Sequence, residues 1–386
     1  STYNTCYRGI IKMKFEKYPF EKLTQLLNNI VPNEKLEPIS LTIGEPQFAT
    51  PQFIQDELVD NISLLNKYPK SAGEDYLKNA QINFVKTRFG VNLEQNQIIP
   101  TFGTREVLFN FPQFYLSKFK NPVIAYTNPF YQIYEGAAIA SNAKIILINL
   151  KIENNFQPII SDEELKDYDL VILNYPNNPT SAVISREELA KWVQKALDFD
   201  FVLINDECYS ELFFDEANPP PSVLEACTTI NPTFKNILAI NSISKRSSAP
   251  GLRSGFIAGD SILLKDYLQY RTYIGCAVPL PLQKAAAIAW NDENHTKEFR
   301  KIYKKNFELA KEILNIEIPN ATFYIWLKVD NELEFTQNLY KEQNVKVLPG
   351  SFLGRNGAGE GYIRIALVEN ETKTREALNR IKKFLG

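Results

Sequence analysis

Three polar stretches in the middle of the chain carry the side chains best suited to chemistry. They are Asn174-Tyr-Pro-Asn-Asn-Pro-Thr, Asn205-Asp-Glu-Cys-Tyr and Asn241-Ser-Ile-Ser-Lys-Arg-Ser-Ser-Ala-Pro-Gly-Leu-Arg, and each follows a short apolar run. Lys245 in the third stretch offers a primary amine, the group that forms a Schiff base with a carbonyl compound. Asp206 in the second offers a carboxylate, which can keep a nearby nitrogen protonated. An amine and an acid in this arrangement indicate chemistry on a bound carbonyl group.

The chain has only one histidine, which removes several common kinds of active site. His295 lies in the polar stretch Asn291-Asp-Glu-Asn-His-Thr, so we expect neither a Ser–His–Asp triad nor a histidine-ligated zinc site. The cysteines show no CxxC spacing, so we expect reduced thiols and no bound metal. They are Cys6, Cys208, Cys227 and Cys276. The chemistry therefore has to rest on lysine, tyrosine, aspartate and a bound cofactor.

The charge of the chain argues against large anionic partners. The 386 residues carry a formal net charge of −2 without a long basic block, so we expect no nucleic acid and no membrane as partner. No apolar run approaches the roughly 20 residues of a membrane helix. The N-terminal residues lack the layout of a signal peptide. These features predict a cytoplasmic protein whose partners are small molecules.

The middle of the chain alternates between short apolar runs and amphipathic stretches. Stretches 162–166 and 185–197 read as helices, the second with a capping box that begins at Ser185. The apolar runs are too short for helices and read as buried strands. These runs are Val123–Tyr126, Ile145–Ile148, Leu170–Leu173, Phe201–Ile204 and Ile237–Ile240. Strands that alternate with helices predict a parallel sheet covered on both faces, with ligands at the carboxyl ends of the strands.

The C-terminal third follows a different pattern, which predicts a smaller α+β domain. One long helical pattern covers about 281–316, and further helices are expected at 334–343 and at the C-terminus. Strands are expected at 322–327, 345–348 and 362–367. We predict a large domain over 41–280 and a small domain over 281–386, which the segment 13–40 joins. Residues 1–12, which precede the sole methionine, are expected to be a leader added for expression.

In this order, each after a predicted strand, the three polar stretches resemble those of the class I and II aminotransferases of fold type I. The resemblance runs from about Tyr18 to the C-terminus. It implies an α/β fold, with a mostly parallel sheet covered by helices in the large domain and a smaller α+β domain from the N- and C-terminal segments. It further implies pyridoxal 5'-phosphate (PLP) as the cofactor, held by Lys245 as a Schiff base, and a homodimer with shared active sites. Ser181 departs from the glycine usual after Asn-Asn-Pro-Thr, and we expect a small backbone adjustment there.

The resemblance assigns four residues to the ring of the cofactor. Asp206 matches the carboxylate that keeps the ring nitrogen protonated, which strengthens electron withdrawal by the ring. Asn178 and Tyr209 match the donors to the phenolic oxygen of the ring, and Tyr131 matches the aromatic side chain that stacks on it. The alternative for each is a structural role: a cap for Asp206, a turn for Asn178 and core packing for the two tyrosines.

The resemblance also assigns residues to the phosphate group. Ser242, Ser244 and Arg253 match its hydroxyl and guanidinium ligands. The segment Gly103-Thr104-Arg105 begins an apolar helical pattern, and backbone N–H groups at a helix N-terminus bind anions. Tyr68, in Lys67-Tyr-Pro-Lys-Ser-Ala-Gly, resembles a tyrosine that reaches the phosphate bound by the neighbouring subunit.

The substrate residues follow from the same resemblance. Arg364, in Tyr-Ile-Arg-Ile-Ala, matches the clamp for the α-carboxylate, and Gly44 matches a glycine whose backbone approaches the same carboxylate. Asn178 also faces the substrate in such enzymes. Arg105 stands where one branch of aspartate aminotransferases has a lysine for the distal carboxylate, so we expect it to bind the far end of a dicarboxylate. A solvated arginine at a helix start is the alternative for Arg105.

Longer stretches point to one branch of the family. Those from Ser247 to Asp260, from Tyr273 to Pro279 and from Val347 to Arg355 look like those of N-succinyldiaminopimelate aminotransferases. This implies transfer of an amino group from glutamate to N-succinyl-2-amino-6-oxopimelate, on the way to lysine and diaminopimelate. An aspartate or aromatic aminotransferase and a PLP-dependent C–S β-lyase of the same fold stay open. A non-catalytic PLP-binding regulator is the remaining alternative.

Overall fold

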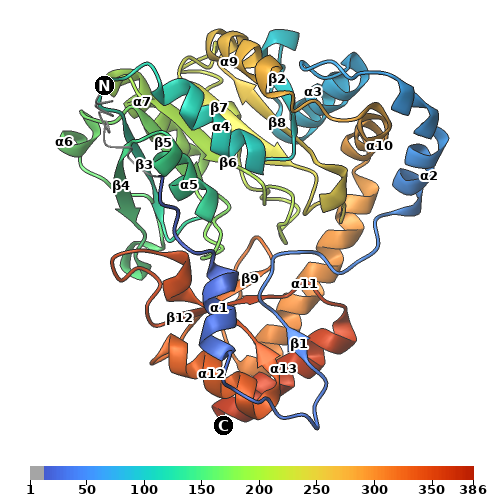
Figure 1. Cartoon of the computed structure of the whole chain (residues 1–386), viewed down its shortest axis with the longest axis vertical. Helices are drawn as coiled ribbons and strands as arrows, with labels where there is room; N and C mark the ends of the chain where they lie inside the picture. The colour runs from blue at the N-terminus through green and yellow to red at the C-terminus, as the bar shows by residue number, and fades with distance from the viewer. Residues whose placement is uncertain (1–12) are drawn as a thin grey trace, which may run out of the picture.

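The computed structural model describes residues 13–386, so the predicted leader 1–12 lies outside the described residues. Figure 1 shows a large upper part with a central sheet between helices, and a smaller lower part that holds α1, α12 and α13. Helix α11 runs from the upper part into the lower part (Figure 1). None of the helices within residues 13–386 combines the length and the apolar character needed to cross a bilayer.

The large part is built on a seven-stranded sheet of order β2-β8-β7-β6-β5-β3-β4. Five neighbouring strands run parallel, whereas β8 lies antiparallel between β7 and β2. The prediction of a mostly parallel sheet is confirmed, and all five predicted strands are present. The strands are β2 (Ile98–Phe102), β3 (Val123–Asn128), β4 (Lys144–Asn149), β5 (Leu170–Asn174), β6 (Val202–Asp206), β7 (Ile237–Ser242) and β8 (Ser254–Gly259).

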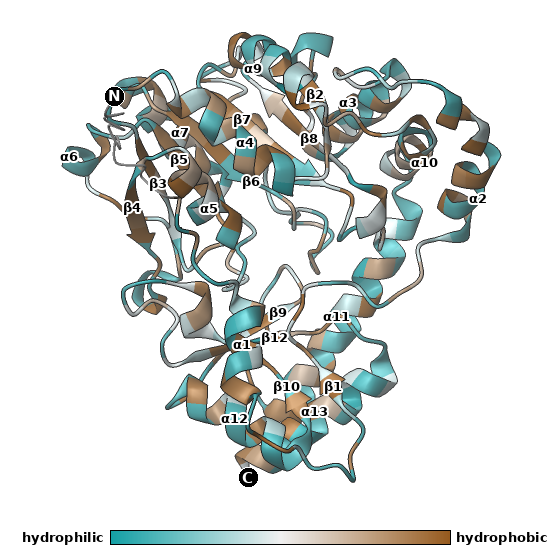
Figure 2. Cartoon of the chain, in the orientation of Figure 1, coloured by the Kyte–Doolittle hydropathy of each residue, from teal (hydrophilic) through white to brown (hydrophobic). Residues whose placement is uncertain are grey.

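Both faces of this sheet are covered, which explains why its strands read as continuous apolar runs. Successive side chains of a strand point to opposite faces. In β5, Val171 and Leu173 therefore belong to the apolar cluster on one face, and Leu170 and Ile172 to the cluster on the other. Figure 2 shows brown, hydrophobic residues along the central strands, whereas the helices beside them carry both teal and brown residues.

Two sets of helices cover the sheet. The first cluster contains side chains of α3 (Asp75–Phe89), α7 (Arg186–Phe199), α8 (Val223–Ala226) and α10 (Leu280–Trp290). The second contains side chains of α4 (Arg105–Leu116), α5 (Gln132–Ala140) and α9 (Ser261–Ile274). Helices α2 (Gln52–Asp60) and α6 (Asp162–Leu165) lie at the periphery. The predicted helix at 185–197 is confirmed, and the hydroxyl of Ser185 accepts the N–H of Glu188 at 3.1 Å.

The smaller part combines both ends of the described chain. Strand β1 (Ile39–Ser40) pairs in parallel with β10 (Val345–Lys346), and β11 (Leu348–Pro349), β12 (Tyr362–Ala366) and β9 (Tyr324–Lys328) form an antiparallel sheet. Its helices are α1 (Pro19–Leu27), α11 (Asn294–Leu314), α12 (Glu332–Gln343) and α13 (Glu371–Leu385). Ile39 and Leu41 belong to the same buried cluster as Leu339 and Leu378, so the N-terminal segment packs with this part.

The expectation of one helical pattern over 281–316 is wrong. The chain forms α10 and α11 with a break at 291–293, because the side chain of Asp292 accepts the backbone N–H of His295 at 2.9 Å and starts a new helix. Helix α10 is apolar over most of its length and α11 is amphipathic, so apolar residues continue through both and do not reveal the break. Ala285, Ala286 and Trp290 also belong to the large-domain core. The side chains of α10 therefore pack with the large part, although α10 follows the boundary expected at 280.

The sheet core should dominate stability. Ile172 is fully buried at the centre of the sheet, so Ile172→Ala should lower the free energy of unfolding by about 2–5 kcal/mol. Ile159 is 63% exposed, and Ile159→Ala should change the free energy of unfolding by less than about 0.5 kcal/mol. Equilibrium denaturation in guanidinium chloride measures both, and equal losses for the two variants would contradict this packing.

Candidate active site

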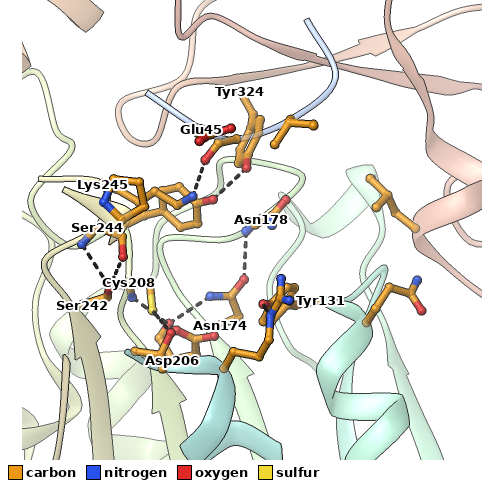
Figure 3. A pocket seen from close by; sticks show the side chains of 18 of the residues that line it. Glu45, Tyr131, Asn174, Asn178, Asp206, Cys208, Ser242, Ser244, Lys245 and Tyr324 are labelled. Carbon is orange, nitrogen blue, oxygen red and sulfur yellow. Dashed lines mark hydrogen bonds between the residues drawn. The ribbon is translucent and has the colours of Figure 1, made fainter. Parts of the chain in front are cut away.

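A cavity of about 480 Å³ opens where the strand ends of the large domain face the small domain. Asn174, Asp206 and Ser242 are the last residues of β5, β6 and β7, three neighbouring strands of the sheet. Most of the residues predicted for the site line this cavity, and Figure 3 shows several of them pointing into it. They are Gly44, Thr104, Arg105, Tyr131, Asn178, Asp206, Tyr209, Ser242, Ser244, Lys245, Arg253 and Arg364. Gly103 and Tyr68 are the predicted residues that do not.

Lys245 extends from the turn after β7 across the cavity. Its ammonium group donates a hydrogen bond to the backbone carbonyl of Gly44. Burial lowers the pKa of Lys245, and the nearby Arg364 acts in the same direction, whereas Tyr324 and Cys208 oppose the shift. The amine is therefore easier to deprotonate than that of an exposed lysine.

Asp206 is buried at the end of β6 and is held by a tyrosine that the sequence did not point to. The hydroxyl of Tyr134 donates to its carboxylate at 2.5 Å, and the backbone N–H of Cys208 donates at 3.3 Å. Burial raises the pKa of Asp206, and both donors oppose this shift because they favour the ionised form. Tyr134 lies three residues after the predicted Tyr131, on the first turn of α5, so helical spacing was the available signal.

Arg364 comes from β12 of the small domain and reaches the large domain. One terminal nitrogen donates to the side-chain oxygen of Asn178 at 2.8 Å, and the other donates to the carbonyl of Thr42 at 2.8 Å. The side chain lies 4.3 Å above the ring of Tyr324. Its buried Nε has no hydrogen-bond partner among the described residues. A buried guanidinium with a free donor is suited to bind an anion.

Tyr324 is a second residue that the sequence analysis missed. Its hydroxyl forms a 2.7 Å hydrogen bond with that of Tyr209, so a tyrosine of the small domain meets one of the large domain. A Cβ atom at position 44 would lie 1.8 Å from the Tyr324 hydroxyl, which explains why only glycine fits there. Tyr324 belongs to an apolar predicted strand, which carried no sign of a polar role.

Hydroxyl groups and a helix N-terminus form one end of the cavity. Ser242 and Ser244 share a hydrogen bond of 3.0 Å between their hydroxyls. Thr104 is the N-cap residue of α4, and its hydroxyl accepts from the thiol of Cys208 at 3.4 Å. The first N–H groups of a helix lack partners within the helix and carry partial positive charge. This end of the cavity is suited to a compact anion such as a phosphate group.

Arg253 adds a positive charge at the same end. It adopts a left-handed backbone conformation with φ of 53°, and its guanidinium donates to the carbonyl of Pro250 at 3.0 Å. A Cβ atom at position 103 would lie 2.4 Å from that guanidinium. Gly103 is therefore not among the residues that line the cavity. Its lack of a side chain leaves the space that Arg253 occupies.

Arg105 and Tyr131 lie together at the wider side of the cavity. The Nε of Arg105 donates to the hydroxyl of Tyr131 at 3.2 Å. Arg105 is the first residue of α4 and stays exposed, so its charge remains available to a ligand. Tyr68 lies elsewhere and is 98% exposed, so it does not contribute to the cavity of its own chain.

The turn after β5 tolerates the serine at position 181. Ser181 has a φ of 63°, a left-handed conformation that favours glycine. Its buried hydroxyl bonds to that of Thr322 at 2.5 Å and to the carbonyl of Tyr324 at 2.8 Å. These bonds link the turn that carries Asn178 to the small domain, and they offset the conformational cost.

Comparison with known proteins decides the family. Residues 37–381 match the family described as aminotransferase class I and II. The chain belongs to the class I and II aminotransferases. It is therefore a PLP-dependent transaminase that acts on small amino and keto acids.

Solved structures and curated relatives agree with this assignment. The aminotransferase AspB of Helicobacter pylori is 51% identical, with a TM-score of 0.93 over 96% of this chain and 99% of that one. An aminotransferase of Neisseria meningitidis is 39% identical, with a TM-score of 0.92 over 96% and 98% of the two chains. An LL-diaminopimelate aminotransferase of Maridesulfovibrio salexigens is 32% identical over 90% of this chain and 91% of its own length. That relative is named for diaminopimelate itself and not for the N-succinylated compound.

The residues of this aminotransferase fit PLP. The cavity volume lies within the range of about 300–1,000 Å³ that is usual for small-molecule sites. The end formed by Ser242, Ser244, Thr104 and Arg253 suits the phosphate group, and the carboxylate of Asp206 suits a protonated ring nitrogen. The amine of Lys245 opens into the same cavity. The donor set thus matches the charge and polarity of each end of the cofactor.

The lowered pKa of Lys245 should be visible when the aminotransferase takes up its cofactor. Only a neutral amine attacks an aldehyde, so the rate of PLP uptake by the apoenzyme should rise with pH. It should level off below pH 10.5, the ordinary lysine pKa, because burial favours the neutral form. Stopped-flow absorbance across pH measures the rate, with Nα-acetyl-lysine amide in solution as the reference. A plateau at the same pH for both would contradict the burial argument.

Proposed function

We propose that this aminotransferase transfers the amino group of glutamate to N-succinyl-2-amino-6-oxopimelate, with Lys245 as the residue that holds PLP. The observation that carries the proposal is the convergence of the Lys245 amine, the Asp206 carboxylate and the Arg364 guanidinium in one cavity. These three groups serve cofactor attachment, cofactor protonation and binding of the substrate α-carboxylate, respectively. No single one of them would indicate the reaction.

The side chains divide the work of the reaction. Bound PLP withdraws electrons from the bonds at the α-carbon of the amino acid. Lys245 removes the proton from that carbon and returns a proton later, a role that its lowered pKa supports. Asp206 stabilises positive charge on the ring nitrogen. Arg364 and Asn178 orient the α-carboxylate, which aligns the bond to the α-hydrogen.

Arg105 supports the choice of a long dicarboxylic substrate. It lies in the same cavity as Arg364 but on the large domain, at the N-terminus of α4. The cavity wall also includes the apolar side chains of Phe20, Ile43 and Leu353. A substrate with methylene groups between two anionic ends would satisfy the two arginines and the apolar wall together.

A second candidate is direct transamination of LL-diaminopimelate. The names of curated relatives at about one-third identity favour it, such as the 32% identical protein of Maridesulfovibrio salexigens. The two candidates differ at the far end of the substrate, where one has a free ammonium group and the other an N-succinyl group. The charge of Arg105 favours the succinylated compound, because it repels an ammonium group.

We also propose that the enzyme is a cytoplasmic homodimer in which Tyr68 reaches the phosphate site of the partner subunit. The 98% exposure of this tyrosine supports the proposal, since a side chain so large and apolar is usually covered. Ile62 and Leu65 in the same segment are also more than half exposed.

A panel of acceptors tests the substrate. Purified enzyme loaded with glutamate should transfer the amino group to N-succinyl-2-amino-6-oxopimelate at least about tenfold faster, in kcat/KM, than to oxaloacetate or phenylpyruvate. The absorbance of the bound cofactor reports each half-reaction. Lys245→Ala should show no multiple turnover, because the proton-transfer group is gone. In the reverse direction with 2-oxoglutarate as the acceptor, faster amino-group transfer from LL-diaminopimelate than from N-succinyl-LL-diaminopimelate would favour the second candidate. Turnover by Lys245→Ala would overturn the assignment of the lysine.

Arg105 should decide between dicarboxylic and monocarboxylic acceptors. Arg105→Gln removes a charged hydrogen bond worth about 1.5–3 kcal/mol, so kcat/KM for the succinylated acceptor should fall about 10- to 100-fold. The value for pyruvate should stay within about twofold. Arg186→Gln, an exposed arginine on α7, is the matched control. Equal losses for both acceptors would show that Arg105 acts on something other than the distal group.

A further inference from the structure

The two residues that follow Lys245 both bind the junction between α10 and α11. A terminal nitrogen of Arg246 donates to the carbonyls of Ala289 and Asp292, each at 3.0 Å. The hydroxyl of Ser247 lies 2.7 Å from Nε2 of His295. Arg246 is 1% exposed and Ser247 is fully buried, so these bonds are shielded from water. The turn that presents Lys245 is thus fastened to a part of the chain almost fifty residues later.

Asp292 fixes the imidazole of His295. Its carboxylate lies 2.6 Å from Nδ1 of the ring and also accepts the backbone N–H of the same histidine at 2.9 Å. An ionised carboxylate only accepts, so Nδ1 carries the proton and Nε2 accepts from the hydroxyl of Ser247. Burial lowers the pKa of His295, which favours this neutral form. The three side chains form one directed chain of hydrogen bonds.

Aromatic side chains hold the imidazole from two sides. Its ring centre lies 5.4 Å from that of Phe53 and 6.4 Å from that of Phe299, both with edge-on geometry. The next residue of the turn, Ser248, accepts from the hydroxyl of Thr50 at 2.6 Å through its carbonyl. The turn therefore also contacts the segment that leads from Gly44 to α2.

The Ser247–His295–Asp292 arrangement resembles a hydrolytic triad in connectivity. It cannot serve as one, because the hydroxyl of Ser247 is fully buried and lies outside the residues that line the cavity. A nucleophile must reach its substrate. The network holds the turn in place and performs no chemistry of its own.

We propose that His295 is a positioning residue for transamination, which holds the turn of Lys245 through Ser247. Asp292 orients the ring, and α11 carries it. Helix α11 continues from this junction into the small domain and packs on α13 there (Figure 1). It therefore connects the turn that carries Lys245 to the domain that supplies Arg364. The inference rests on the proposal that Lys245 holds the cofactor. It adds that residues outside the cavity determine the position of the Lys245 amine.

Two substitutions remove the hydrogen bond between Ser247 and His295 in different ways. Ser247→Ala deletes only the hydroxyl, and His295→Phe keeps an aromatic ring between Phe53 and Phe299 but deletes both ring nitrogens. Each should lower kcat about tenfold and leave KM for glutamate within about twofold, because the lost interaction positions the amine and does not bind substrate. The double variant should be no slower than His295→Phe alone, since both changes break one interaction.

Hydrogen–deuterium exchange of the apoenzyme provides a readout that is independent of turnover. Amides of residues 243–249 should exchange about tenfold faster in both variants, whereas amides of β3 and β5 should be unchanged. Ser117→Ala is the matched control, because it removes a serine hydroxyl that bonds a helix carbonyl at the far end of α4. It should alter neither kcat nor exchange in the turn.

The outcomes separate the inference from the proposed function. Unchanged kcat and unchanged exchange in Ser247→Ala would overturn the positioning role, and that variant decides the matter if His295→Phe does not fold. A rise in KM with constant kcat would also overturn it. If Lys245→Ala still binds PLP with the absorbance of the unaltered enzyme, the proposed role of Lys245 fails, and this result is distinct from any change in exchange.

Discussion

Burial acts on Lys245 and Asp206 in the same way, because loss of water favours the neutral form of an amine and of a carboxylate alike. One pKa is lowered and the other is raised. The enzyme needs the lowered pKa of Lys245 and has to oppose the raised pKa of Asp206. Tyr134 and the backbone N–H of Cys208 donate to Asp206 and favour its ionised form. The surrounding structure thus lets burial ease the deprotonation of the amine, whereas its hydrogen bonds oppose the effect of burial on the carboxylate.

The sheet makes this arrangement possible. Parallel strands bring their carboxyl ends to one edge, and in this chain β5, β6 and β7 end in Asn174, Asp206 and Ser242. Backbone hydrogen bonds of the sheet fix these positions relative to one another. The small domain then completes the cavity with Arg364 and Tyr324, two residues from adjacent strands of its own sheet. The site is therefore rigid on one side and depends on domain packing on the other.

The sequence predicted the large-domain side of the site far better than the small-domain side. Lys245, Asp206 and Asn178 follow apolar runs, and strand order together with family resemblance is enough to place them. Tyr324 lies inside an apolar strand, and its role arises from contact with Tyr209, more than a hundred residues away in the chain. The link between Ser247 and His295 was missed for the same reason. Spacing reveals neighbours on one helix or strand, but it carries no information on contacts between elements that only the fold brings together.

The absence of a side chain at position 44 has a consequence for the wall of the active site. The Tyr324 hydroxyl occupies the space that a methyl group would fill, so the backbone between Leu41 and Gln47 lies directly against this side chain. An alanine there would displace the Tyr324 ring and with it the hydroxyl that bonds to Tyr209. A missing atom thus determines where the part of the cavity wall formed by Tyr324 stands.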